Sequence, residues 1–149
     1  MRVLGIDYGA RRVGLALSDA TGTLASPWRF VERPPSEADA LRVLAEIVEA
    51  LRQGEDGLEA VVVGWPRRLD GSPTHQTALV EAFSRTLAQR TGLRVVLQDE
   101  RLSSHAADER LADGGERDWR ARKRKLDAAA AAVILQDFLD SRTAGACGS

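Results

Sequence analysis

The chain has 149 residues, 44% of them hydrophobic and 29% charged, which is typical of one soluble domain that buries roughly 70% of its unfolded surface. Its formal net charge of -1 excludes a global attraction to nucleic acid or membrane, so any polyanion site has to come from a local cluster of Lys and Arg. A single cysteine, Cys147, excludes an internal disulfide, and no apolar run approaches a membrane span, so we expect a cytoplasmic protein.

Three strands are predicted at the start of the chain. The apolar run 3–6 is ended by Asp7, and residues 12–19 alternate well enough for a second strand, with a turn at 8–11 between the two. These two strands should form a hairpin. A third strand is expected around 25–31, where Pro27 would confine it to a sheet edge or a bulge.

Helices and strands then alternate. Ser36 is a candidate N-cap for a first helix, and Ser72 followed by Pro73 should open a second one. Between them, the continuous apolar run 60–64 predicts a strand in the buried middle of a parallel sheet. A further strand is predicted at 94–98.

The remaining elements are a short helix near 104–112, a polar loop and a final helix near 126–140. A meander followed by alternating helices and strands predicts an α/β fold, with a mixed five-stranded sheet covered by helices on both faces. We expect a single domain at 1–141 and a disordered tail at 142–149.

Three acidic residues follow predicted strands or begin a predicted helix. Asp7 ends the first strand, Glu100 follows the strand at 94–98, and Asp127 stands at the head of the last helix. Each also has an ordinary explanation: a turn residue, a charged residue after a strand, and a helix N-cap, respectively. Carboxylates that converge at one edge of a sheet would form a site for a divalent metal ion.

A basic segment directly precedes Asp127. Basic charge neutralises phosphates and an aromatic ring offers a surface on which a base can stack, although a solvated charged loop is the usual explanation of such a run. The residues concerned are Arg117, Trp119, Arg120, Arg122, Lys123, Arg124 and Lys125.

Four ordered motifs, at 5–19, 62–72, 99–104 and 125–136, resemble those of the YqgF/RuvX family of pre-16S rRNA nucleases, which are related to Holliday junction resolvases. The first motif begins Gly5-Ile6-Asp7-Tyr8-Gly9. The chain departs from the family's usual residues at four positions, none of them acidic: Trp65, Leu69, Ser103 and Ser104.

The resemblance implies an RNase H-like fold, with Asp7, Glu100 and Asp127 as a catalytic acidic triad. Such a triad would suit Mg²⁺ or Mn²⁺, and two such ions could promote in-line hydrolysis of a phosphodiester bond. Arg11, Arg12 and Arg101 would contact phosphate, and the basic segment would hold the substrate backbone. The implied role is processing of the 5' end of pre-16S rRNA in ribosome biogenesis, with pre-16S rRNA or the pre-ribosomal particle as partner.

Other functions remain open at this stage. The same acids would serve a resolvase cutting branched DNA at four-way junctions, which requires a homodimer rather than a monomer. A phosphotransferase of the actin and sugar-kinase type shares the Gly-x-Asp-x-Gly turn but needs a second domain, for which the chain has no room. The third alternative is a non-catalytic nucleic-acid-binding module in transcription or ribosome assembly.

Overall fold

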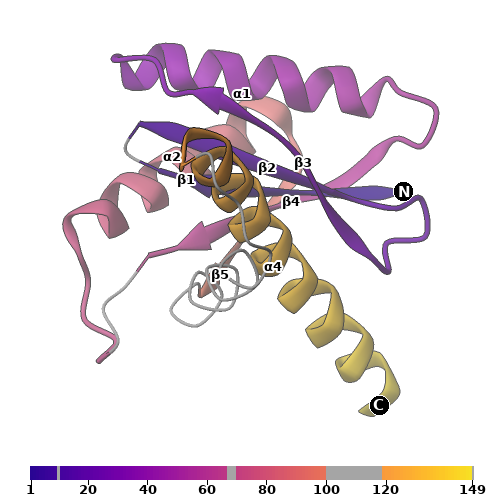
Figure 1. Ribbon diagram of the computed structural model, residues 1–149. Helices are drawn as coiled ribbons and strands as arrows, with labels where there is room; N and C mark the ends of the chain where they lie inside the picture. The colour runs from indigo at the N-terminus through magenta and orange to yellow at the C-terminus, as the bar shows by residue number, and fades with distance from the viewer. Residues whose placement is uncertain (10, 67–69, 100–118, 149) are drawn as a thin grey trace.

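The strands form one mixed sheet in the computed structural model, which describes residues 1–9, 11–66, 70–99 and 119–148, with backbone alone at 119–127 and 143–148 (Figure 1). They are β1 (Arg2–Tyr8), β2 (Arg12–Ser18), β3 (Ala25–Glu32), β4 (Leu58–Trp65) and β5 (Arg94–Asp99). Their order across the sheet is β3-β2-β1-β4-β5. The first three strands pair antiparallel, whereas β4 and β5 run parallel to β1. The predicted mixed five-stranded sheet is confirmed.

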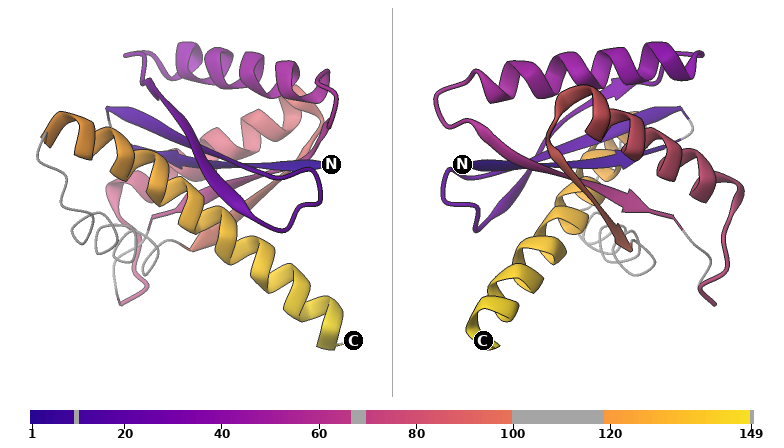
Figure 2. Two further views of the ribbon diagram at one scale, coloured as in Figure 1. Left: turned by 45° about the vertical axis from the view of Figure 1, so that its right-hand side comes forward. Right: turned by 180° about the vertical axis from the view of Figure 1, so that it is seen from behind.

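Helices cover both faces of this sheet, as predicted. The helices α1 (Glu37–Arg52) and α2 (His75–Thr91) lie on one face, and α4 (Trp119–Gly148) crosses the other (Figure 2). Ser36 caps α1, as its sequence position predicts. The short helix expected near 104–112 lies outside the described residues. Among the described helices, none combines the length and the apolar composition that crossing a membrane requires.

The central strand β1 is buried on both faces, so its successive side chains enter two different cores. Leu4, Ile6 and Tyr8 pack with α1 and α2, while Val3 packs with α4. Burial of a Leu or Val side chain contributes about 1.5–3 kcal/mol to folding. This alternation fixes which face of the sheet each residue of β1 occupies.

The edge strand β3 is irregular at Pro27, as expected for a proline in a strand. The β2–β3 register shifts there, because Pro27 pairs with Ala16 but the next pair skips one residue of β3. Gln136 of α4 bonds to the start of this edge: it accepts from the Ala25 amide at 2.9 Å and donates to the Thr23 carbonyl at 3.0 Å. The bulge at Pro27 and the bonds from Gln136 both hinder this edge from pairing with another chain.

The start of α2 differs from the prediction. Its N-cap is Thr74 rather than Ser72, and the Thr74 amide donates to Thr77 Oγ1 at 2.8 Å. Ser72 bonds instead to Asp70, with its amide and hydroxyl 2.9 and 2.6 Å from Asp70 Oδ1. The aspartate therefore holds Ser72 in a turn before the helix.

The last helix is longer than predicted at both ends. It spans Trp119–Gly148, whereas the sequence pattern places it near 126–140. Most of the basic segment is therefore helical, not a loop. At the other end, the backbone is helical through 142–148, where we expected a disordered tail; the division of the chain into domain and tail stays a prediction.

Gly92, just after α2, is a sensitive position for stability. It adopts a left-handed conformation, with φ of 74°, and its amide donates to the Ala88 carbonyl at 2.9 Å. An added Cβ would meet no atom within 4 Å, so the cost of Gly92→Ala is purely conformational. We expect this change to lower the free energy of unfolding by about 1 kcal/mol in urea titrations. Gly92→Asn should cost less, because asparagine tolerates this conformation; equal losses for both variants would contradict the explanation.

Candidate active site

Asp7 is the penultimate residue of β1, at the carboxyl end of the strand. Because Val3 and Gly5 face α4 and side chains alternate along a strand, Asp7 also faces the α4 side. The residue is half-buried. A half-buried carboxylate is only partly hydrated, which favours partners that bring positive charge.

Glycines flank Asp7 on both neighbouring strands. Gly14 of β2 is its direct cross-strand partner. On the other side, the β1–β4 register ends with Ile6 opposite Val63, so the next pair in that register is Asp7 and Gly64. Since neither glycine has a side chain, the strand positions next to the carboxylate place no side chain against it.

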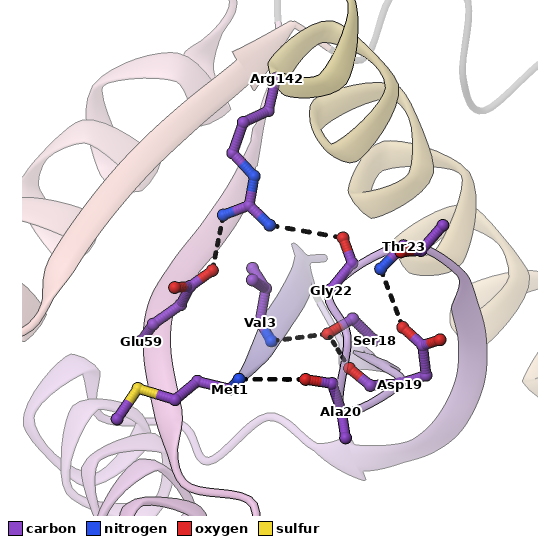
Figure 3. Close-up of polar contacts among 9 residues, drawn as sticks. All are labelled: Met1, Val3, Ser18, Asp19, Ala20, Gly22, Thr23, Glu59 and Arg142. Atoms are coloured by element: carbon purple, nitrogen blue, oxygen red, sulfur yellow. Dashed lines mark hydrogen bonds and ion pairs between the residues drawn. The ribbon is translucent and has the colours of Figure 1, made fainter. Parts of the chain in front are cut away.

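The helix α4 runs across this face toward Asp7. A Cβ on Gly5 would lie 2.8 Å from Leu135 Cβ and 3.0 Å from the Ala131 carbonyl oxygen, so the helix touches the β1 backbone two residues before Asp7. Further along α4, Arg142 bonds to Glu59 and to the Gly22 carbonyl, at the end of the sheet where β1 begins (Figure 3). The helix therefore starts at the end of the sheet where β1 finishes.

The side chains of two of the three predicted acidic ligands are not described. Glu100 follows β5 directly but lies outside the described residues. Asp127 is an interior residue of α4, because the helix begins at Trp119, so the N-cap explanation is wrong. It precedes Ala131 by about one helical turn, and its side chain is not described. Among the described side chains, no three of His, Cys, Asp and Glu gather as a metal site.

The predicted phosphate-binding arginines differ in their surroundings. Arg11 is exposed in the turn after β1. Arg12 opens β2 on the face that Asp7 occupies, with its guanidinium carbon 5.5 Å from the centre of the Phe30 ring and Nε 3.7 Å from Glu32. Arg101 and Arg117 lie outside the described residues. The backbone of the rest of the basic segment forms the first turns of α4.

A polar cluster around Tyr8, on the α1–α2 side of the sheet, was not predicted from the sequence. The Tyr8 hydroxyl donates to Glu37 Oε2 at 2.9 Å, and Arg33 forms an ion pair with the other oxygen of that carboxylate. Burial and the bond to Glu37 raise the pKa of Tyr8 to about 12, so the hydroxyl keeps its proton and remains a donor. No short motif joins these residues, because 29 positions separate Tyr8 from Glu37.

Asp19, a weaker candidate acid in the sequence, is a turn residue. Its carboxylate accepts from the Thr23 amide at 2.8 Å (Figure 3). It also accepts from the Leu24 amide at 3.2 Å and from the Thr21 hydroxyl at 2.8 Å, and these bonds lower its pKa. Because β2 runs antiparallel to β1, Asp19 lies at the opposite end of the sheet from Asp7. A supporting role at the Asp7 site is therefore excluded.

The chain is similar over nearly its whole length to proteins of one family. A family model described as "RuvX: Holliday junction resolvase" matches residues 1–141. A protein of Maridesulfovibrio salexigens named "Putative pre-16S rRNA nuclease" is 42% identical over 139 residues, which cover 93% of this chain and 98% of that protein. A protein of the same name from an Anaeromyxobacter species is 44% identical over 146 residues, which cover 97% of this chain and 100% of that protein.

Solved structures share the fold at lower identity. RuvC of Thermus thermophilus superposes with a TM-score of 0.56 at 20% identity, with 97% of each chain covered. The same protein in complex with a Holliday junction substrate superposes with a TM-score of 0.56 at 20% identity, with 96% of each chain covered. At this identity the likeness concerns the fold alone, and the expected RNase H-like fold is confirmed.

Proposed function

Because this chain belongs to the RuvX Holliday junction resolvase family, we propose that it is a metal-dependent endonuclease that hydrolyses phosphodiester bonds in pre-16S rRNA. Two relatives carry the name "Putative pre-16S rRNA nuclease", and the alignments cover this chain and each relative almost completely. The activity would be exerted in the cytoplasm, on the 5' end of the precursor or on a pre-ribosomal particle.

The position of Asp7 is the main evidence for the catalytic part of this proposal. Its half-buried carboxylate lies at the carboxyl end of a parallel strand, between Gly14 and Gly64, on the face crossed by α4. Ligands of open α/β sheets bind at this edge. Carboxylate oxygens are the ligands that Mg²⁺ and Mn²⁺ prefer, so the chemistry of this residue fits such an ion.

Glu100 and Asp127 would complete the ligand set. In β5, Val95 and Leu97 pack on the α1–α2 side and Val96 on the α4 side, so an extension of the strand would turn Glu100 toward α4. Asp127 precedes by four residues Ala131, which approaches β1 at Gly5, two residues before Asp7. When bound, two divalent ions would supply a nucleophilic water at neutral pH and stabilise the charge on the leaving oxygen.

The basic residues would hold the substrate backbone. Trp119, Arg120, Arg122, Lys123, Arg124 and Lys125 stand on the first turns of α4, at the end of the helix that approaches Asp7. Lys and Arg there would neutralise phosphates, and Trp119 would stack on a base. Arg11, Arg12, Arg101 and Arg117 would add phosphate contacts around the same edge.

Cutting four-way DNA junctions is the second candidate, since the family description names that activity. The acidic site would serve both substrates, so chemistry does not separate them. Symmetric cleavage of a junction requires two active sites in a homodimer, whereas RNA cleavage by a monomer does not. Solution mass measured with and without a junction therefore separates the two.

Removal of the metal gives the first test. Purified protein is mixed with a precursor rRNA fragment or a four-way DNA junction, with Mg²⁺ or Mn²⁺, and then with EDTA. We expect RNA cleavage that EDTA abolishes and added Mn²⁺ restores. Junction-selective cutting would favour the resolvase. Binding of RNA without metal-dependent cleavage of either substrate would favour a non-catalytic role in ribosome assembly.

A further inference from the structure

Arg33 holds the turn that follows Asp7. It comes directly after β3, and its backbone amide donates to the Arg11 carbonyl at 2.9 Å. Its side chain reaches further into the same turn, where Nη1 donates to the Gly9 carbonyl at 3.2 Å. Only 11% of this side chain is exposed, and its bond to Gly9 is partly buried. A charge-assisted bond in such a setting is stronger than an ordinary surface contact.

The same guanidinium also holds Tyr8. Its carbon lies 4.4 Å from the centre of the Tyr8 ring, and that ring stacks on Phe83 with the centres 4.2 Å apart. Glu37 closes the cluster, because one carboxylate accepts from the Tyr8 hydroxyl and pairs with Arg33. Tyr8, the residue next to Asp7, is thus immobilised by three contacts. They are the cation–π contact with Arg33, the stack on Phe83 and the bond to Glu37, which Arg33 also holds.

Gly9 is tightly held by its neighbours. The Gly9 amide donates to the Asp7 carbonyl at 3.1 Å and to the Arg12 carbonyl at 3.0 Å, so Asp7 is part of the bonded turn. A Cβ on Gly9 would lie 2.6 Å from the Arg12 oxygen, closer than any side chain tolerates. Whatever moves Gly9 therefore moves the peptide of Asp7.

We propose that Arg33 is a positioning residue of the site: by holding Gly9 and Tyr8 from behind, it fixes the direction in which Asp7 presents its carboxylate. It does so from the α1–α2 side, to which Tyr8 points, and touches neither cation nor substrate. The proposal rests on the proposed nuclease function and adds to it a residue outside the acidic triad.

The test compares Arg33→Gln and Arg33→Lys with Arg42→Gln. Arg42 is a matched control on α1, since its side chain is 54% exposed and pairs only with Asp39 and Glu46 among the described residues. The first readout is amide hydrogen exchange at Gly9, which should be about tenfold faster in Arg33→Gln. The second is the Mn²⁺ concentration that half-saturates RNA cleavage, which should rise several-fold.

The split between kinetic constants separates positioning from folding. We expect kcat to fall about tenfold in Arg33→Gln, with KM for RNA unchanged, because a misdirected carboxylate weakens the chemical step and not substrate binding. Arg33→Lys should recover part of the loss, since lysine keeps the positive charge and a donor nitrogen but lacks the planar guanidinium. The Arg42→Gln variant should match the wild type.

Failure of the proposed function can be distinguished from failure of the Arg33 inference. If the wild type neither binds Mn²⁺ nor cleaves RNA, the proposed function is lost, and this inference with it. If the wild type cleaves and Arg33→Gln has the same kcat and Mn²⁺ dependence, only the role of Arg33 is refuted. A variant that merely loses thermal stability, with normal kinetics below its melting temperature, also counts against it.

Discussion

Asp7→Asn is expected to abolish metal-dependent cleavage while the protein stays folded. Asparagine keeps the shape of the side chain but removes the charge that would bind a divalent ion beside Gly14 and Gly64. We expect kcat to fall on the order of a thousandfold, equivalent to about 4 kcal/mol in the activation free energy. The measurement is single-turnover cleavage of the precursor RNA fragment at saturating Mn²⁺.

Asp19→Asn is the matched control for that substitution. It makes the same chemical change in the turn at the opposite end of the sheet, where the carboxylate caps backbone amides. We expect Asp19→Asn to leave kcat near the wild-type value and Asp7→Asn to melt no lower than the wild type in metal-free buffer. Residual cleavage by well-folded Asp7→Asn at the wild-type rate would remove Asp7 from the catalytic site.

Where local chemistry decided the structure, the sequence predicted it well. The uninterrupted apolar run at 60–64 marks a strand buried on both faces, and Ser36 is followed three residues later by the amide that it caps. Asp7 is recognisable for a related reason: a carboxylate at the end of an apolar run needs an explanation. These patterns lie within a few residues of one another.

Competition between similar residues limited the prediction elsewhere. Ser72 and Thr74 are both good N-caps, and the outcome depends on Asp70, which bonds to Ser72 in the turn. The predicted start of α4 was wrong because a run of charge suggests a solvated loop, yet Arg, Lys and Ala all have high helix propensity. The Tyr8 cluster could not be predicted, since its residues come from β1, α1 and the segment after β3, and only the fold joins them.

Gly5→Ala is expected to destabilise the protein more than Gly92→Ala does. Its new methyl group would lie 2.8 Å from Leu135 Cβ and 3.0 Å from the Ala131 carbonyl oxygen. Neither atom can rotate away, because one is a Cβ and the other belongs to the helix backbone. The helix α4 must therefore move off the sheet, and overpacking of this kind costs about 2 kcal/mol. Urea unfolding should report the loss.

The same displacement of α4 should also lower the rate of cleavage. In the proposed site Asp127, on α4, shares a metal ion with Asp7. A shift of the helix beside Gly5 would misplace it, and we expect kcat to fall even under conditions where the variant is folded. Ser26→Ala, a change of similar size at an exposed position of β3, should alter neither stability nor rate. A Gly5→Ala protein with reduced stability but a normal kcat would show that α4 can shift without disturbing catalysis, and would count against Asp127 as a ligand.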